Sequence, residues 1–132
     1  MIYGIGTDIL RTERVAATFE RFGERFVDRL LMPEERALYG RTRQAVRFLA
    51  MRFAAKEAIV KAMGTGFANG MWIRDAGVVP DRLGRPEIVF SQRGQRLCKR
   101  LGIAGGHLTL SDEAGLVVAV AVLMRSTPGS KP

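Results

Sequence analysis

The sequence is poor in the residues that most often build metal and redox sites. Its 132 residues include one cysteine, Cys98, and one histidine, His107. A single cysteine excludes an internal disulfide and a cysteine-built metal site, and it is typical of the reducing cytoplasm. The longest apolar run, residues 116–124, is far shorter than the roughly 20 residues of a membrane helix. The first ten residues lack the basic start of a signal peptide. We therefore expect a soluble, cytoplasmic protein.

Acidic residues are also scarce relative to basic ones. The chain has 21 Lys and Arg against 13 Asp and Glu, which gives a formal net charge of +8. Such a positive field favours encounters with polyanions, which include nucleic acids, acidic proteins and phosphate-rich small molecules. Composition alone leaves these three classes of partner open.

The apolar pattern predicts an α+β fold in which an antiparallel sheet packs against a long central helix. Residues 1–125 form a single domain in this prediction, and residues 126–132, rich in Ser, Pro and Gly, form a disordered tail. Thr12 is predicted to be a helix N-cap, and Gly64 to end the longest helix. The expected elements are strands over 1–10, 72–79, 87–90, 107–110 and 116–123, and helices over 12–22, 25–31, 44–63 and 91–101, with a short one that opens at Pro33.

One charged residue interrupts an apolar seam of the longest predicted helix. Positions 46, 50, 53, 57, 60 and 64 alternate steps of four and three, and Glu57 is the only charge among them. A buried, unpaired carboxylate is costly, so a functional reason is one interpretation. An ordinary ion pair with Lys61, one helical turn later, is the other.

Asp8 raises the same question at the end of the predicted first strand. It follows Gly4 and Gly6, which allow another backbone or a ligand to approach closely. Asp8 either caps the next helix or acts together with Glu57. Two carboxylates whose remaining coordination positions are filled by water and phosphate oxygens are typical of a Mg²⁺ site.

Several further features have both a structural and a functional interpretation. Residues 64–66, Gly-Thr-Gly, are either a helix C-cap or a backbone that curls around a phosphate near Lys61. His107 is either structural or catalytic, and Cys98 is expected to be a small packed residue. Arginines at 14, 21, 25 and 29 form a basic stripe whose usual interpretation is a solvated face.

Two stretches of this chain resemble the signatures of the 4′-phosphopantetheinyl transferases. They are Ile5-Gly-Thr-Asp-Ile9 and Arg52-Phe-Ala-Ala-Lys-Glu-Ala-Ile-Val-Lys-Ala-Met-Gly-Thr-Gly66. The chain length and the segment His107-Leu-Thr-Leu-Ser111 are similar to the short bacterial type of this family. The match in order and spacing spans residues 3 to 123.

The resemblance implies a homotrimer that binds coenzyme A in a cleft between subunits, uses Mg²⁺ and modifies an acidic acyl carrier protein. By position, Asp8 and Glu57 match the Mg²⁺ ligands, and both, with Lys61, match catalytic positions. The basic stripe matches the helix that receives the carrier, through Arg14, Arg21 and Arg25. Positions expected at coenzyme A are Arg52, Lys61, Gly64, Thr65, Gly66, Pro86 and His107.

The implied reaction moves 4′-phosphopantetheine from coenzyme A to a serine of the apo carrier and releases 3′,5′-ADP, in fatty acid biosynthesis. A polyketide or peptide synthetase carrier stays open as the acceptor. An alternative from another class is a basic nucleic-acid-binding module, which gives no reason for Glu57 in an apolar seam. This chain has Asp112 where some family members carry a second histidine, so no role for a second histidine is carried over.

Overall fold

The computed structural model describes residues 1–127, and the rest of the predicted tail, residues 128–132, lies outside the described residues. The chain forms the predicted α+β fold with antiparallel sheets, one with strand order β1-β5-β4 and one with β2-β3. The elements are β1 (Ile2–Arg11), α1 (Thr12–Phe22), α2 (Glu24–Leu30), α3 (Pro33–Tyr39), α4 (Ala45–Met63), the 3-10 helix η1 (Ile73–Asp75), β2 (Ala76–Pro80), β3 (Pro86–Phe90), α5 (Gln92–Leu101), β4 (Ile103–Glu113) and β5 (Leu116–Arg125).

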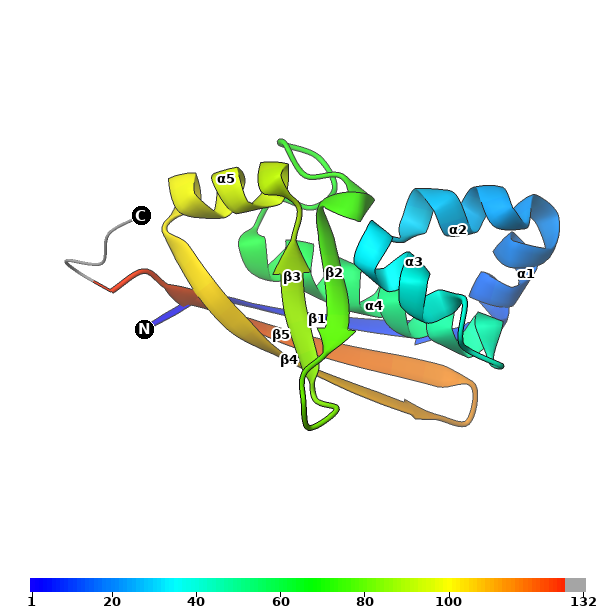
Figure 1. Cartoon of the computed structure of the whole chain (residues 1–132). Helices are drawn as coiled ribbons and strands as arrows, with labels where there is room; N and C mark the ends of the chain where they lie inside the picture. The colour runs from blue at the N-terminus through cyan, green and yellow to red at the C-terminus, as the bar shows by residue number, and fades with distance from the viewer. Residues whose placement is uncertain (128–132) are drawn as a thin grey trace.

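The long helix α4 runs across the three-stranded sheet. Helices α1 to α3 lie toward one end of the molecule, and α5 lies toward the other (Figure 1). Gly64 ends α4 in the left-handed conformation (φ 81°), as predicted for a helix stop. Ser91 caps α5, since its hydroxyl accepts a hydrogen bond from the Gly94 N–H at 3.0 Å.

Two local predictions differ from the structure. Thr12 is the first residue of α1 and not its N-cap, because β1 continues through Arg11, which pairs with Leu116, and the chain passes directly into the helix. The segment 72–75 is not part of a strand. Asp75 accepts a hydrogen bond from the Trp72 N–H at 2.8 Å, and this contact folds the segment into the 3-10 turn η1 before β2 begins.

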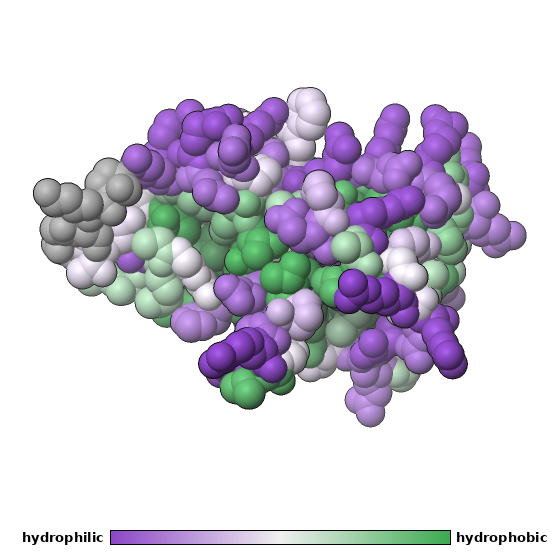
Figure 2. Space-filling view, viewed as in Figure 1, coloured by the Kyte–Doolittle hydropathy of each residue, from purple (hydrophilic) through white to green (hydrophobic). Residues whose placement is uncertain are grey.

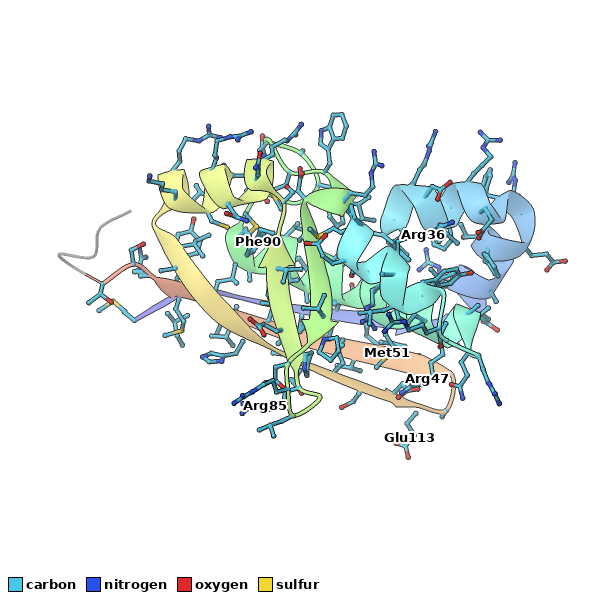
Figure 3. All side chains as sticks on the ribbon, viewed as in Figure 1. Arg36, Arg47, Met51, Arg85, Phe90 and Glu113 are labelled. Carbon is cyan, nitrogen blue, oxygen red and sulfur yellow. The ribbon has the colours of Figure 1, made fainter. Side chains whose placement is uncertain are left out.

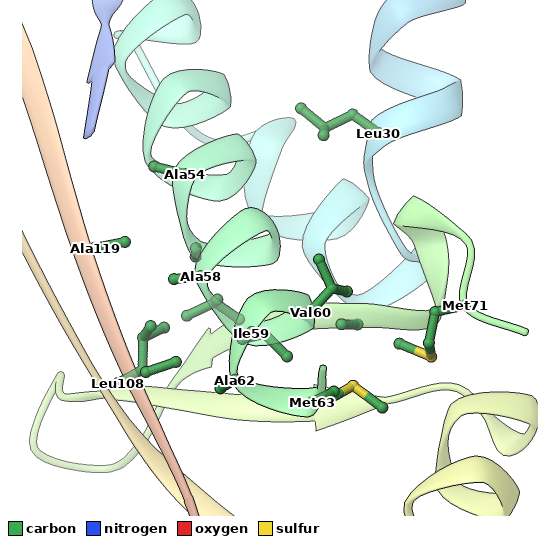
Figure 4. Packing of buried hydrophobic residues seen from close by; sticks show 14 of the residues in the cluster. Leu30, Ala54, Ala58, Ile59, Val60, Ala62, Met63, Met71, Leu108 and Ala119 are labelled. Carbon is green, nitrogen blue, oxygen red and sulfur yellow. The ribbon is translucent and has the colours of Figure 1, made fainter. Parts of the chain in front are cut away.

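Small residues bring α4 and β1 unusually close together. A Cβ atom added to Gly6 would lie 2.0 Å from the carbonyl oxygen of Ala58, and one added to Gly4 would lie 2.1 Å from that of Ala62. Ala58 and Ala62 lie on the helix face that packs against the sheet, near Ala119 of β5 (Figure 4). Glycine on the strand and alanine on the helix therefore let the two backbones touch.

The two faces of the three-stranded sheet have different surroundings. Leu108, Val117, Ala119 and Leu123 are buried on the face toward α4. On the opposite face Ile5 and Ile9 are 58% and 66% exposed in the single chain. This apolar open face is defined by Ile5, Ile9 and Val118.

The helices and the single cysteine can be compared with the sequence-based expectations. Within residues 1–127, no helix combines the length and the apolar character needed to cross a membrane. Cys98 is buried in α5, and this burial raises the pKa of its thiol to about 11. The thiol is therefore neutral near pH 7, in agreement with a packing role.

Candidate active site

Asp8 and Glu57 lie together because β1 and α4 pack so closely. Asp8 is in the middle of β1 rather than at its end, and it shares the α4-facing side of the strand with Gly4 and Gly6. Its side chain is 14% exposed. Asp8 and Glu57 line one cavity of about 310 Å³, with Arg14 of α1 among the other lining residues. The cavity thus joins three elements at a pair of carboxylates.

The electrostatics of this cavity favour a cation. Burial, and then the charge of Asp8, raise the pKa of Glu57. Within the described residues, no hydrogen bond or ion pair reaches the Glu57 carboxylate. No group of three or more His, Cys, Asp or Glu side chains in this part of the chain forms another candidate metal site. The donor set, two carboxylates with free oxygens, fits a hard divalent cation such as Mg²⁺.

Lys61 contacts Asp8 and not Glu57. Its Nζ atom lies 3.0 Å from the backbone oxygen of Thr7 and 3.3 Å from Oδ1 of Asp8. The ordinary i,i+4 ion pair is therefore not formed. The interpretation of Asp8 as a helix cap is also wrong. The N-cap residue of α1 is Arg11, and no side chain caps this helix.

The Gly64–Gly66 loop serves first as the end of α4. The backbone N–H groups of Gly64, Thr65 and Gly66 all donate to the carbonyl oxygen of Val60, at 3.1 to 3.3 Å. These amides are therefore not free to bind an anion in this conformation. The polar side chains at this turn are those of Thr65, whose hydroxyl donates to the carbonyl oxygen of Gly66 at 2.9 Å, and Asn69, whose amide donates to the carbonyl oxygen of Thr65 at 3.3 Å.

Arg52 and Pro86 line a second cavity, of about 520 Å³. Met51 and Thr109 also line it, and Met51 is labelled in Figure 3. His107 is exposed and lies on β4 two residues before Thr109, on the same side of the sheet. Neither Arg52, Pro86 nor His107 lines the carboxylate cavity. Within one chain, Arg52 and Pro86 therefore share a cavity, whereas His107 pairs with Val122 and lies on the open face of the sheet with Ile5.

The basic stripe begins at the carboxylate cavity. Arg14 lines that cavity, whereas Arg25 and Arg29 line a smaller hollow of about 210 Å³ with Phe22 and Phe26. Arg14, Arg21, Arg25 and Arg29 are exposed and make no ion pair within the described residues. Hydrophilic side chains cover this end of the molecule and also α5 (Figure 2).

The buried charge of α4 is Lys56 rather than Glu57. The seam prediction treated Glu57 as the charge among apolar residues, but Glu57 is only partly buried, whereas Lys56 and Glu35 are both fully buried and form an ion pair at 2.6 Å. Sequence reasoning missed this pair. Glu35 resembles any acidic residue in the first turn of a helix, and no periodicity indicates that α3 turns it inward.

Asp112 of β4 has a partner in α4. Arg47 donates to both of its carboxylate oxygens, at 2.8 and 3.1 Å, and this contact lowers the pKa of Asp112. Figure 3 shows Arg47 near the end of β4 that also carries Glu113. The Arg47–Asp112 pair ties the first turn of α4 to the end of β4.

Comparisons with known proteins converge on one family. The family model described as "4'-phosphopantetheinyl transferase superfamily" matches residues 4–121. A holo-[acyl-carrier-protein] synthase of Nitrosospira multiformis is 45% identical over 123 residues, which cover 93% of this chain and 98% of that protein. The crystal structure of holo-[acyl-carrier-protein] synthase from Neisseria meningitidis matches 95% of this chain and all of its own, with 39% identity and a TM-score of 0.90. A Bacillus anthracis holo-(acyl-carrier-protein) synthase in complex with CoA (3',5'-ADP) matches 96% of this chain and 99% of its own, with 32% identity and a TM-score of 0.77.

Proposed function

Because this chain belongs to the 4′-phosphopantetheinyl transferase superfamily and to its holo-[acyl-carrier-protein] synthases, we propose how it carries out that activity. The chain transfers 4′-phosphopantetheine from coenzyme A to a serine of apo acyl carrier protein. It releases 3′,5′-ADP, requires Mg²⁺ and serves fatty acid biosynthesis in the cytoplasm. The observation that carries the site assignment is the cavity shared by Asp8 and Glu57, with Lys61 bonded to Asp8.

Asp8 and Glu57 hold the Mg²⁺ ion in this proposal. Each offers carboxylate oxygens to the same cavity, and Glu57 has no other cationic partner within the described residues. The chemistry supplied by Mg²⁺ when bound is the neutralisation of charge on the pyrophosphate of coenzyme A. The two carboxylates thus determine where the pyrophosphate can bind.

Lys61 supplies a second positive charge beside this pair. In the reaction, the serine hydroxyl of the carrier gives its proton to water, and its oxygen bonds to the phosphorus next to pantetheine. The bond from that phosphorus to the oxygen of 3′,5′-ADP breaks, and 3′,5′-ADP leaves with the bonding electrons. Negative charge builds on the departing oxygen, so an ammonium group close to the pyrophosphate lowers the barrier. Hydrogen bonds to Thr7 and Asp8 keep the Lys61 ammonium beside the carboxylate pair. Because its side chain is half exposed, the ammonium can also turn toward a bound phosphate.

We also propose that the complete site forms between copies of the chain, in a homotrimer. The separation of the predicted coenzyme A residues supports this, since Arg52 and Pro86 line a different cavity from Asp8 and Glu57, and His107 lies on the open face of the sheet. The apolar open face of Ile5, Ile9 and Val118 is a surface that self-association would cover. Gly64, Thr65 and Gly66 stay assigned to coenzyme A through the Thr65 hydroxyl, because their backbone N–H groups donate to the carbonyl oxygen of Val60.

The proposed activity is tested by mass spectrometry of apo acyl carrier protein incubated with coenzyme A, Mg²⁺ and this protein. We expect the carrier to gain one phosphopantetheine group, and we expect a chelator to prevent the gain. Excess Mg²⁺ added after the chelator restores it in the control reaction. Unmodified carrier in all reactions would contradict the proposal. Polyketide and peptide synthetase carriers, tested in parallel, determine which acceptor is preferred.

The basic stripe is proposed to receive the acidic carrier, and charge reversal tests this. We expect Arg21→Glu with Arg25→Glu to raise the KM for the carrier roughly 10-fold at low salt, because oppositely charged surfaces speed association. Added salt should narrow the difference, since about 0.1 M salt screens exposed charges beyond about 10 Å.

A matched control keeps the same change in net charge. Arg96→Glu with Arg100→Glu reverses two exposed arginines on α5, which line none of the cavities of the site. Its KM for the carrier should stay near that of the unchanged protein. Equal effects of the two double variants would mean that overall charge, and not the stripe, attracts the carrier.

A further inference from the structure

A buried carboxylate connects α3, β2 and α4. Glu35 of α3 has no exposed surface. Its Oε1 atom accepts hydrogen bonds from Lys56 Nζ at 2.6 Å and from its own helix start, Met32 N, at 3.0 Å. Its Oε2 atom accepts from Val78 N of β2 at 3.0 Å and lies 3.7 Å from Arg52 Nε. One carboxylate therefore faces two cations of α4, one turn apart.

Arg52 is the member of this network that reaches a cavity. Its Nη2 atom donates to the backbone oxygen of Val78 at 3.2 Å, and its guanidinium lies 4.0 Å from the centre of the Phe48 ring. Its side chain is 15% exposed and lines the cavity that also contains Pro86. Val78 holds the guanidinium by a hydrogen bond and Phe48 by stacking, whereas Glu35 attracts it by charge alone, since the buried Nε atom of Arg52 makes no hydrogen bond within the described residues.

Packing of the core does not by itself require the charges of Glu35, Arg52 and Lys56. An apolar pair of similar volume often stabilises a protein core as well as a buried ion pair does. Burial lowers the pKa values of both Lys56 and Arg52, so holding two cations here is unfavourable without the carboxylate. The arrangement is explained if the guanidinium must be held in one place at the cavity wall.

We propose that Glu35 is a positioning residue for coenzyme A: it holds Arg52 in the orientation that binds the donor, and Lys56 supplies the remaining counter-charge. The proposal rests on the proposed function, because it assigns the Arg52 cavity to coenzyme A. Glu35 itself is fully buried, so its side chain is out of reach of a molecule in the cavity. Its effect on coenzyme A therefore passes through Arg52.

The main test replaces the ion pair by apolar residues in Glu35→Leu with Lys56→Met. This variant keeps a filled core but leaves Arg52 without its carboxylate. We expect its KM for coenzyme A to rise roughly 10-fold or more, the scale seen when a group that orients a ligand is removed. The kcat and the KM for the carrier should change less than about twofold, because Asp8, Glu57 and Lys61 do not depend on this contact.

A coupling measurement separates positioning from a general loss of structure. Arg52→Ala should raise the KM for coenzyme A in the unchanged protein but add less than about twofold in the Glu35→Leu, Lys56→Met background, because both changes act through one guanidinium. Multiplied effects of the two changes would overturn the proposal. Glu34→Gln removes the neighbouring exposed carboxylate and should change neither constant.

The outcomes also separate this proposal from the proposed function. Unchanged coenzyme A kinetics in the folded double variant would refute the role of Glu35 alone. An unchanged protein that neither binds coenzyme A in calorimetry nor modifies a carrier would refute both. Glu35→Gln, which keeps the volume of the side chain but cannot accept hydrogen bonds at both terminal atoms, gives the same comparison if the double variant does not fold.

Discussion

Glu57→Gln is expected to lower the rate of phosphopantetheine transfer at least about 100-fold, the scale of losing one key electrostatic group of a catalytic site. Glutamine has nearly the same shape but carries no charge, so it weakens the cation site without changing its volume. Asp8→Asn should have a similar effect. The double variant should be little slower than either single one, because both carboxylates serve one ion. The transfer rates of the three variants are compared as initial rates at saturating coenzyme A and at several Mg²⁺ concentrations.

Thermal unfolding of Glu57→Gln without metal tests whether the lower rate comes from loss of folding. Burial and Asp8 raise the pKa of Glu57, so the folded protein holds that proton more tightly than the unfolded chain does. Stability therefore falls as pH rises through the range between the ordinary and the raised pKa, and glutamine removes this loss. The variant should unfold at the same temperature as the unchanged protein or higher. Glu34→Gln is the matched control and should retain full activity. Full activity of Glu57→Gln would refute the metal assignment.

Gly6→Ala is expected to destabilise the protein by at least about 3 kcal/mol, at or above the upper end for overpacked sites. The new Cβ atom would lie 2.0 Å from the Ala58 oxygen and 2.6 Å from the Ala62 nitrogen, both backbone atoms of α4. Helix backbone cannot move aside as a side chain can, so β1 and α4 must separate. The midpoint of thermal unfolding should fall by roughly 10 °C or more.

The same substitution at an open glycine provides the control. Gly40 has helical dihedral angles (φ −62°, ψ −15°), and a Cβ atom there would come no closer than 3.7 Å to another residue. Gly40→Ala should leave stability unchanged or raise it by about 0.4–1 kcal/mol, because alanine restricts the unfolded chain. If Gly6→Ala were as stable as Gly40→Ala, close packing of β1 on α4 would not be what brings Asp8 to Glu57.

Local signals predicted most of the elements correctly. Gly64 ends α4 and Ser91 caps the start of α5. Both residues act on backbone groups within one helical turn, so the sequence alone indicates these boundaries. The strand prediction at Trp72 was wrong because an aspartate three residues later favours a tight turn over an extended chain. The expected single domain over residues 1–125 stays a prediction.

The carboxylate pair could be suggested from the sequence but not shown by it. Asp8 and Glu57 are unusual in apolar surroundings, and the signature spacing identified them as a possible site. Their approach, however, depends on contacts between residues far apart in the chain. The Glu35–Lys56 pair had no such signal, because burial of α3 against β2 and α4 turns one of two adjacent glutamates inward.

The sequence by itself determined the family, the order of the elements and the residue types available for catalysis, because these depend on motifs and on periodicity along the chain. Only the tertiary structure decided that Lys61 contacts Asp8 rather than Glu57, and that Arg52 lies beside a buried glutamate. The physical reason is distance, because side-chain charges select partners by proximity in space. Close packing of β1 on α4 brings Lys61 to Asp8, and packing of α3 on β2 and α4 brings Glu35 to Arg52.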